Sequence, residues 1–99
     1  MKKLFIAAFM IVSSFGTNVM ADGHAIKMGI ILGFTGPIES LTPAMAGSAE
    51  LAFKEASDSG SLLGGKKIEV VRADSTCVDS AAATAAAEGV ISQGVAAIM

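Results

Sequence analysis

The stretch from Ile26 to Pro37 constrains the fold more than any other part of this 99-residue chain. Apolar side chains occupy most positions from Ile26 to Leu32, which is the pattern of a buried strand. Gly33, Gly36 and Pro37 then end the run with residues that suit sharp turns. In an open parallel sheet, the loop at the carboxyl end of a strand borders the ligand crevice. We therefore expect this stretch to supply both a core strand and part of a site.

The residues before this strand have the pattern of an export signal. Lys2 and Lys3 form a positive start, and residues 4–12 are uncharged and apolar. Residues 19–21 are small, or are tolerated by signal peptidase, at the positions that this enzyme reads. We expect residues 1–21 to be a signal peptide that is cleaved after Ala21. A membrane anchor is the alternative, but the strongly apolar run is much shorter than the roughly 20 residues that a membrane-spanning helix needs.

Residues 22–99 alternate strands and helices. After the first strand, Thr42 as cap and Pro43 at the first helical position predict a helix that runs to about Ser57. A turn over residues 62–65, a second strand over residues 67–73, a second helix from Asp79 or Ser80 to residue 93, and a third strand over residues 95–99 follow. This order is the start of a doubly wound, mostly parallel α/β sheet. The second strand alternates charged and apolar residues, so we expect it nearer the sheet edge than the first.

Helical spacing also predicts which faces of the two helices are buried. The expected inward residues are Met45, Ala49, Ala52 and Ala56 with Leu51 and Phe53 flanking in the first helix, and Ala83, Ala86 or Ala87, Val90 and Ile91 in the second. Glu50 and Lys54 lie four residues apart on the outer side, where we expect a weak surface ion pair.

The composition excludes several classes of function. Lys2 and Lys3 lie in the leader, so residues 22–99 keep five basic residues against nine acidic ones, and the chain has no Trp or Tyr. Such a chain lacks the basic stripe and stacking residues of a nucleic-acid binder. Its glycines do not form a dinucleotide fingerprint, and no set of His, Cys and carboxylate residues fits a zinc site or hydrolysis. We therefore expect no cofactor and no enzyme active site.

His24 and Cys77 are the two residues with metal or redox chemistry to consider. After cleavage at Ala21, His24 would be the third residue, where a square-planar Cu(II) or Ni(II) site is conceivable. A flexible tail with an incidental His is the stronger interpretation. Cys77 is the only cysteine in a chain addressed to an oxidising compartment, which suggests a partner elsewhere, a reactive thiol or an unpaired structural cysteine.

We favour a partner for Cys77 beyond Met99, because we expect the loop after the third strand to lie beside the loop after the second. A catalytic thiol would need a general base, and His24 in a flexible tail is a poor candidate. The chain stops at a strand that lacks its following loop, so we expect residues 22–99 to be the first part of a larger protein.

The ordered set of segments resembles the amino terminus of the periplasmic substrate-binding proteins of ABC transporters, in the branched-chain (Leu/Ile/Val) amino-acid family. The matching features are the signal peptide, the strand over 26–32, the Thr35-Gly36-Pro37 loop, the helix over 44–56, and the segments 64–71, 74–77 and 94–99. The resemblance covers the whole of residues 22–99 in the right order.

The resemblance implies a type I periplasmic binding fold, in which residues 22–99 form the amino-terminal part of lobe 1. Such a protein would close two lobes on an amino acid, or on an amide, urea or an aromatic acid, and deliver it to an ABC permease without catalysis. Thr35, Gly36 and Leu41 would form one wall of the cleft. Leu41 stands where the family often has an aromatic residue, which suggests a different or more aliphatic ligand. Cys77 matches a family cysteine whose disulfide partner would follow Met99, and a sensor on the same fold is the alternative function.

Overall fold

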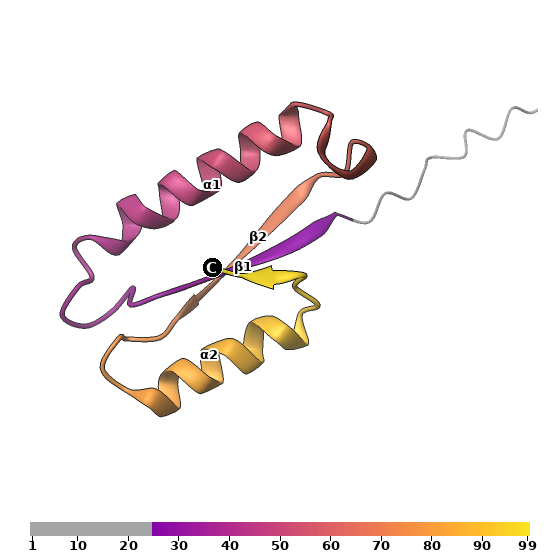
Figure 1. Cartoon of the computed structure of the whole chain (residues 1–99). Helices are drawn as coiled ribbons and strands as arrows, with labels where there is room; N and C mark the ends of the chain where they lie inside the picture. Colours follow the sequence, from indigo (N-terminus) through magenta and orange to yellow (C-terminus); the bar gives the residue numbers. More distant parts are fainter. Residues whose placement is uncertain (1–24) are drawn as a thin grey trace, which may run out of the picture.

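The computed structural model describes residues 25–99, so the expected signal peptide and His24 lie outside the described residues. Within that range the chain forms one parallel sheet of three strands in the order β2-β1-β3. The strands are β1 (Ile26–Leu32), β2 (Ile68–Asp74) and β3 (Ala97–Ile98), and the helices are α1 (Thr42–Asp58), α2 (Ser80–Ser92) and a short 3₁₀ turn, η1 (Leu62–Gly64). The predicted order of strands and helices is confirmed (Figure 1).

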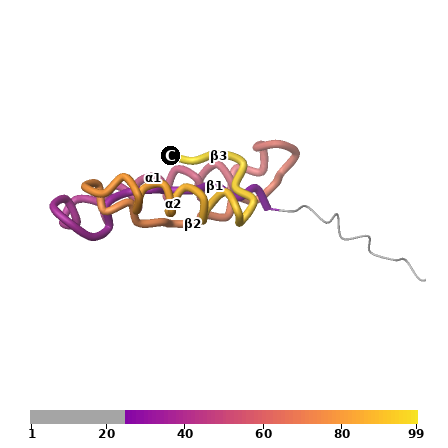
Figure 2. Tube along the Cα trace, turned by 90° about the horizontal axis from the view of Figure 1, so that it is seen from below, coloured from indigo at the N-terminus to yellow at the C-terminus, as the bar shows by residue number. Residues whose placement is uncertain are grey.

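The two long helices cover opposite faces of the sheet. Figure 1 shows the strands between α1 and α2, and Figure 2, turned by 90°, shows α2 in front of the strands and α1 behind them. The chain passes from β1 to β2 through α1 and returns past β1 to β3 through α2. Parallel strands with crossover helices on both faces define the doubly wound α/β class, so the predicted fold class is confirmed.

Strand β1 is the centre of the fold, as its apolar run predicts. It pairs with β2 along its whole length, from Ile26 opposite Ile68 to Leu32 opposite Asp74, and with β3 on its other side. Ile30 is fully buried. At the neighbouring Gly29, an added Cβ would lie 3.4 Å from Val90 Cγ2, so the glycine allows α2 to approach the sheet closely.

The buried faces of the helices differ from the predicted ones. Met45 and Leu51 in α1 and Ile91 in α2 are more than half exposed, whereas the residues with buried side chains in α1 are Thr42, Ala46 and Ser57. In α2, Val90 is buried as predicted. Of the predicted face of α1, Ala49, Phe53 and Ala56 are partly buried, whereas Met45 and Ala52 are exposed. The prediction missed Thr42 and Ser57 because apolar periodicity ignores buried hydroxyl groups that satisfy backbone hydrogen bonds.

The two predicted helix caps had different outcomes. Asp79 caps α2, since its Oδ1 accepts hydrogen bonds from the amides of Ala81 at 2.8 Å and Ala82 at 3.3 Å. Thr42 does not cap α1: it is already inside the helix, and its hydroxyl donates to the carbonyl oxygen of Gly33 at 3.1 Å. A short polar side chain before a helix therefore predicts a hydrogen bond but not its partner.

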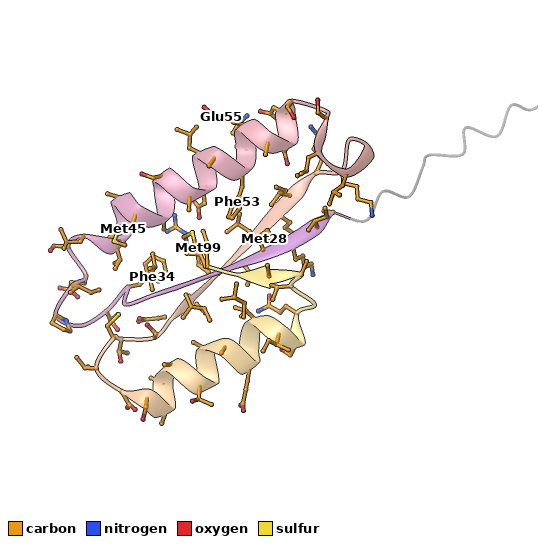
Figure 3. The ribbon with its side chains drawn as sticks, in the orientation of Figure 1. Met28, Phe34, Met45, Phe53, Glu55 and Met99 are labelled. Carbon is orange, nitrogen blue, oxygen red and sulfur yellow. The ribbon has the colours of Figure 1, made fainter. Side chains whose placement is uncertain are left out.

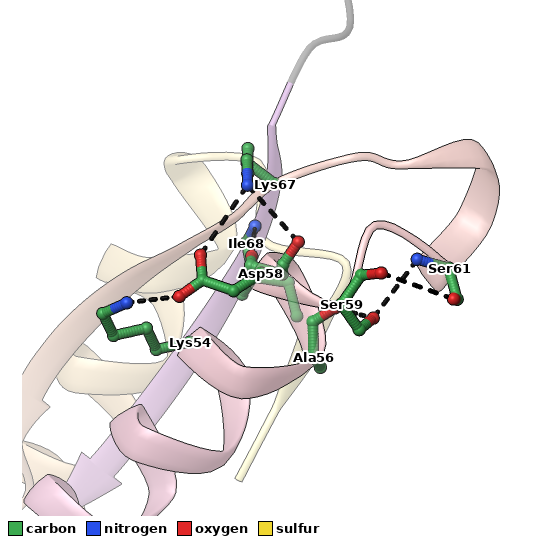
Figure 4. Close-up of polar contacts among 8 residues, drawn as sticks. Lys54, Ala56, Asp58, Ser59, Ser61, Lys67 and Ile68 are labelled. Atoms are coloured by element: carbon green, nitrogen blue, oxygen red, sulfur yellow. Dashed lines mark hydrogen bonds and ion pairs between the residues drawn. The ribbon is translucent and has the colours of Figure 1, made fainter.

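The carboxyl end of α1 is fastened to the start of β2 (Figure 4). The buried Ser57 hydroxyl accepts a hydrogen bond from the Ile68 amide at 2.6 Å, and Lys67 Nζ lies 3.7 Å from Asp58 Oδ1. Asp58 also pairs with Lys54. The predicted pair between Glu50 and Lys54 is therefore wrong, because a neighbour one turn further on holds Lys54.

Candidate functional site

Two loops meet at the carboxyl edge of the sheet. The first, residues 33–41, follows β1, and the second, residues 75–79, follows β2. Because Leu32 and Asp74 are register partners, both loops leave the sheet at the same level, and the Ser75 amide extends the pairing by donating to the Leu32 carbonyl oxygen at 2.9 Å. The loop after β1 carries the predicted site residues Thr35, Gly36 and Leu41, and the second loop carries Cys77.

The carboxylate of Asp74, the last residue of β2, joins these two loops. Its Oδ2 accepts a hydrogen bond from the Thr35 hydroxyl at 2.5 Å, and its Oδ1 accepts from the amides of Thr76 at 2.8 Å and Thr35 at 3.3 Å. The Thr35 hydroxyl, followed by these amides, holds the pKa of Asp74 below its ordinary value. Sequence reasoning proposed Thr35 as a polar group of the cleft wall, but its hydroxyl is engaged by Asp74.

The role of Asp74 was missed from the sequence, although one signal could have shown part of it. An Asp at a strand end commonly accepts a hydrogen bond from the amide two residues later, as Thr76 donates here. The bonds to Thr35 connect positions 39 residues apart, so no local pattern predicts them.

Gly36 lies directly against the second loop. Its φ of +98° is in the region that favours glycine, and an added Cβ would lie 2.8 Å from the carbonyl oxygen of Thr76. Gly33, at the end of β1, has a similar constraint, because an added Cβ would lie 2.8 Å from Cys77 Sγ. Gly36 therefore allows the two loops to pack backbone against backbone, and Gly33 leaves room for the Cys77 side chain.

Leu41 stands at the end of the first loop, directly before α1, with its side chain 61% exposed. The next residue, the buried Thr42, donates its hydroxyl to the carbonyl oxygen of Gly33 and so ties the two ends of this loop together. Met45 follows one turn later and is also about half exposed. Leu41 and Met45 therefore expose apolar surface where α1 begins, although sequence reasoning assigned Met45 to the buried face of the helix.

A charged side chain supports the first loop from the sheet. Arg72 of β2 donates to both carboxylate oxygens of Glu50, at 2.5 and 2.8 Å, and its guanidinium carbon lies 5.3 Å from the centroid of the Phe34 ring. The hydrogen bond to Arg72 lowers the pKa of Glu50, and the Glu50 carboxylate raises the pKa of Arg72. Figure 3 shows Phe34 and Met45 at the end of the molecule where α1 begins. Neither Phe34 nor Arg72 was singled out from the sequence.

Cys77 is exposed, and its sulfur lies over Gly33 at the end of β1. The strand order corrects the reason given above for its pairing. Strand β1 lies between β2 and β3, so these two strands are not neighbours, and their ends lie about 9.5 Å apart across the sheet, or two strand spacings. The position of the sulfur over β1 shortens that gap.

The carboxyl edge formed by residues 25–99 is an open surface, with no enclosed pocket in the part of the chain that the structure describes. The same residues contain no cluster of three His, Cys, Asp or Glu side chains arranged to hold a metal ion. None of the helices in this range is both long and apolar enough to span a membrane.

A sequence model of the periplasmic binding protein family matches residues 25–99, which is the whole of the described structure. The chain belongs to the periplasmic binding proteins. Membership agrees with the parallel sheet between two helical layers, which is the start of a type I periplasmic binding fold. It indicates a periplasmic protein that binds a small-molecule solute, a role that is normally not enzymatic. A search of curated protein sequences gave no significant match.

Proposed function

We propose that this periplasmic binding protein is the exported component of an ABC importer and captures a branched-chain or other amino acid by closure of two lobes. Residues 22–99, after removal of a signal peptide at 1–21, form the first part of lobe 1, and an inner-membrane permease receives the ligand. The exposed Leu41 carries the proposal, because it lies at the carboxyl edge of a parallel sheet, where open α/β sheets bind ligands.

The chemistry of the wall favours an aliphatic ligand over an aromatic one. Leu41 and Met45 offer flexible apolar surface and no ring for stacking. Gly36 keeps the wall close to the second loop, and Thr35 contributes through its hydrogen bonds to Asp74. Amides, urea and aromatic acids are the competing ligands.

Calorimetric titration of the complete exported protein that carries this chain tests the proposal, with L-leucine, L-isoleucine, L-valine, L-phenylalanine, benzoate and urea as ligands. Leu41→Ala should weaken binding of L-leucine by roughly tenfold to a hundredfold, because the Leu41 side chain is covered when the lobes close. Leu51→Ala is the matched control, since Leu51 is similarly exposed but belongs to the body of α1. Equal affinities of the Leu41→Ala variant and the unaltered protein would remove Leu41 from the site.

We also propose that Cys77 forms a disulfide with a cysteine that follows Met99. The Ile31 amide donates to the Met99 carbonyl oxygen, so the chain leaves β3 close to the level of Gly33, over which the Cys77 sulfur lies. Thiol alkylation of the complete exported protein, followed by mass analysis, tests the pairing. Modification of Cys77 without prior reduction would contradict it.

A further inference from the structure

The carboxylate of Asp74 accepts hydrogen bonds from both loops at the carboxyl edge of the sheet. Three protein donors occupy its carboxylate, and they come from both loops: the amide and hydroxyl of Thr35 in the first, and the amide of Thr76 in the second. A solvent-facing carboxylate is normally hydrated. Here the hydrogen bonds to protein form a bridge between segments that the sheet itself does not connect.

The second loop needs such a hold, because its backbone is unfavourable. Thr76 and Cys77 have φ values of 57° and 63°, in a region that residues with side chains rarely adopt and that is a genuine outlier for a β-branched residue such as Thr. The Thr76 hydroxyl is also buried without a hydrogen-bond partner among residues 25–99. Conformations of this kind persist only when surrounding contacts fix them, and Asp74 provides one such contact.

The first loop is fixed at two places. Thr42 ties its ends together through the Gly33 carbonyl oxygen, and Asp74 holds Thr35 near its start. Between these points, Gly36 lies directly against the Thr76 carbonyl group. A movement of the second loop at Thr76 would therefore act on the first loop at Gly36.

We propose that Asp74 is a positioning residue: by holding Thr35 and Thr76 at once, it fixes the loop over residues 33–41 and thereby the direction of Leu41. The statement that Leu41 contacts a ligand rests on the proposed function. The statement that Asp74 fixes the loop does not depend on it. The two claims are therefore tested by different measurements.

Backbone ¹⁵N relaxation by NMR on the full chain, without ligand, tests the hold. In Asp74→Ala, the order parameters of residues 34–41 should fall from about 0.85, typical of a rigid backbone, to below about 0.6. Thr35→Val should cause a smaller fall, and Thr35→Ser, which keeps the hydroxyl, should restore rigidity. Residues of α2 should be unaffected in all three variants.

Asp79→Ala is the matched control, because Asp79 is also a carboxylate that accepts two backbone hydrogen bonds, but only within its own helix. It should loosen the first turn of α2 and leave residues 34–41 rigid. Unchanged order parameters at residues 34–41 in Asp74→Ala would overturn the proposal, as would an equal loss across the whole chain. If Asp74→Ala does not fold, the comparison of Thr35→Val with Thr35→Ser decides. A rigid loop with no amino-acid binding would count against the proposed function alone.

Discussion

Gly36→Ala is expected to destabilise the protein, whereas Gly47→Ala, the same chemical change in the middle of α1, is expected to stabilise it. At Gly36 the backbone φ is +98°, and a Cβ would lie 2.8 Å from the Thr76 carbonyl oxygen. At Gly47 a Cβ would meet nothing within 4 Å. The two sites therefore separate backbone strain and steric overlap from the ordinary effect of adding a methyl group.

The structure gives the direction and the approximate size of both effects. A left-handed backbone costs an alanine about 1–2 kcal/mol, and displacement of a neighbouring backbone by an added methyl group costs about 1–3 kcal/mol. Gly36→Ala should therefore lower the free energy of unfolding by about 2–5 kcal/mol. Gly47→Ala should raise it by about 0.5–1 kcal/mol, because alanine loses less conformational freedom in a helix.

Urea unfolding followed by circular dichroism measures both changes, since the midpoint shifts with stability when the slope is unchanged. Gly89→Ala in α2 is a second control, because it too has open space around the added Cβ. The tight approach of the two loops would be refuted if Gly36→Ala changed the free energy of unfolding by less than about 0.5 kcal/mol, the size expected for a neutral surface substitution.

Two further predictions concern the core and the dependence on pH. Ile30→Ala should lower the free energy of unfolding by about 2–5 kcal/mol, because it leaves a cavity in the core. Ile91→Ala, at an exposed position, should change it by less than about 0.5 kcal/mol. Similar effects of the two variants in urea unfolding would contradict the burial of β1. Because the pKa of Asp74 is lowered in the folded chain, its hydrogen bonds contribute fully above the unfolded pKa of about 4 and are lost as pH falls through the folded pKa. Asp74→Asn should therefore weaken the acid-induced loss of stability in urea unfolding series from neutral pH to pH 2, and identical pH profiles would show that Asp74 contributes nothing.

The sequence alone determined the order of the elements and the place of β1. A mostly apolar run over residues 26–32 favours burial on both faces, and the charged and apolar alternation of β2 fits an edge. Asp79 or Ser80 was predicted as the cap of α2, and Asp79 is the cap, because a cap and the amides that donate to it are close in the chain. The place of Leu41 in a cleft wall came from the family resemblance and stays a prediction. The predicted features depend on residues close in the sequence or on the spacing of apolar residues within one strand or helix.

Tertiary structure alone decided the buried hydroxyls and the long-range hydrogen bonds of the loops. Local spacing predicted a pair between Glu50 and Lys54, but the fold brings Glu50 to Arg72 on β2, which offers two hydrogen bonds instead of one. Asp74 similarly meets Thr35 only because β1 and β2 pair in register to their ends. A side chain with several possible hydrogen-bond partners pairs with the one that the packed backbone places within reach. Sequence spacing does not predict which partner that is.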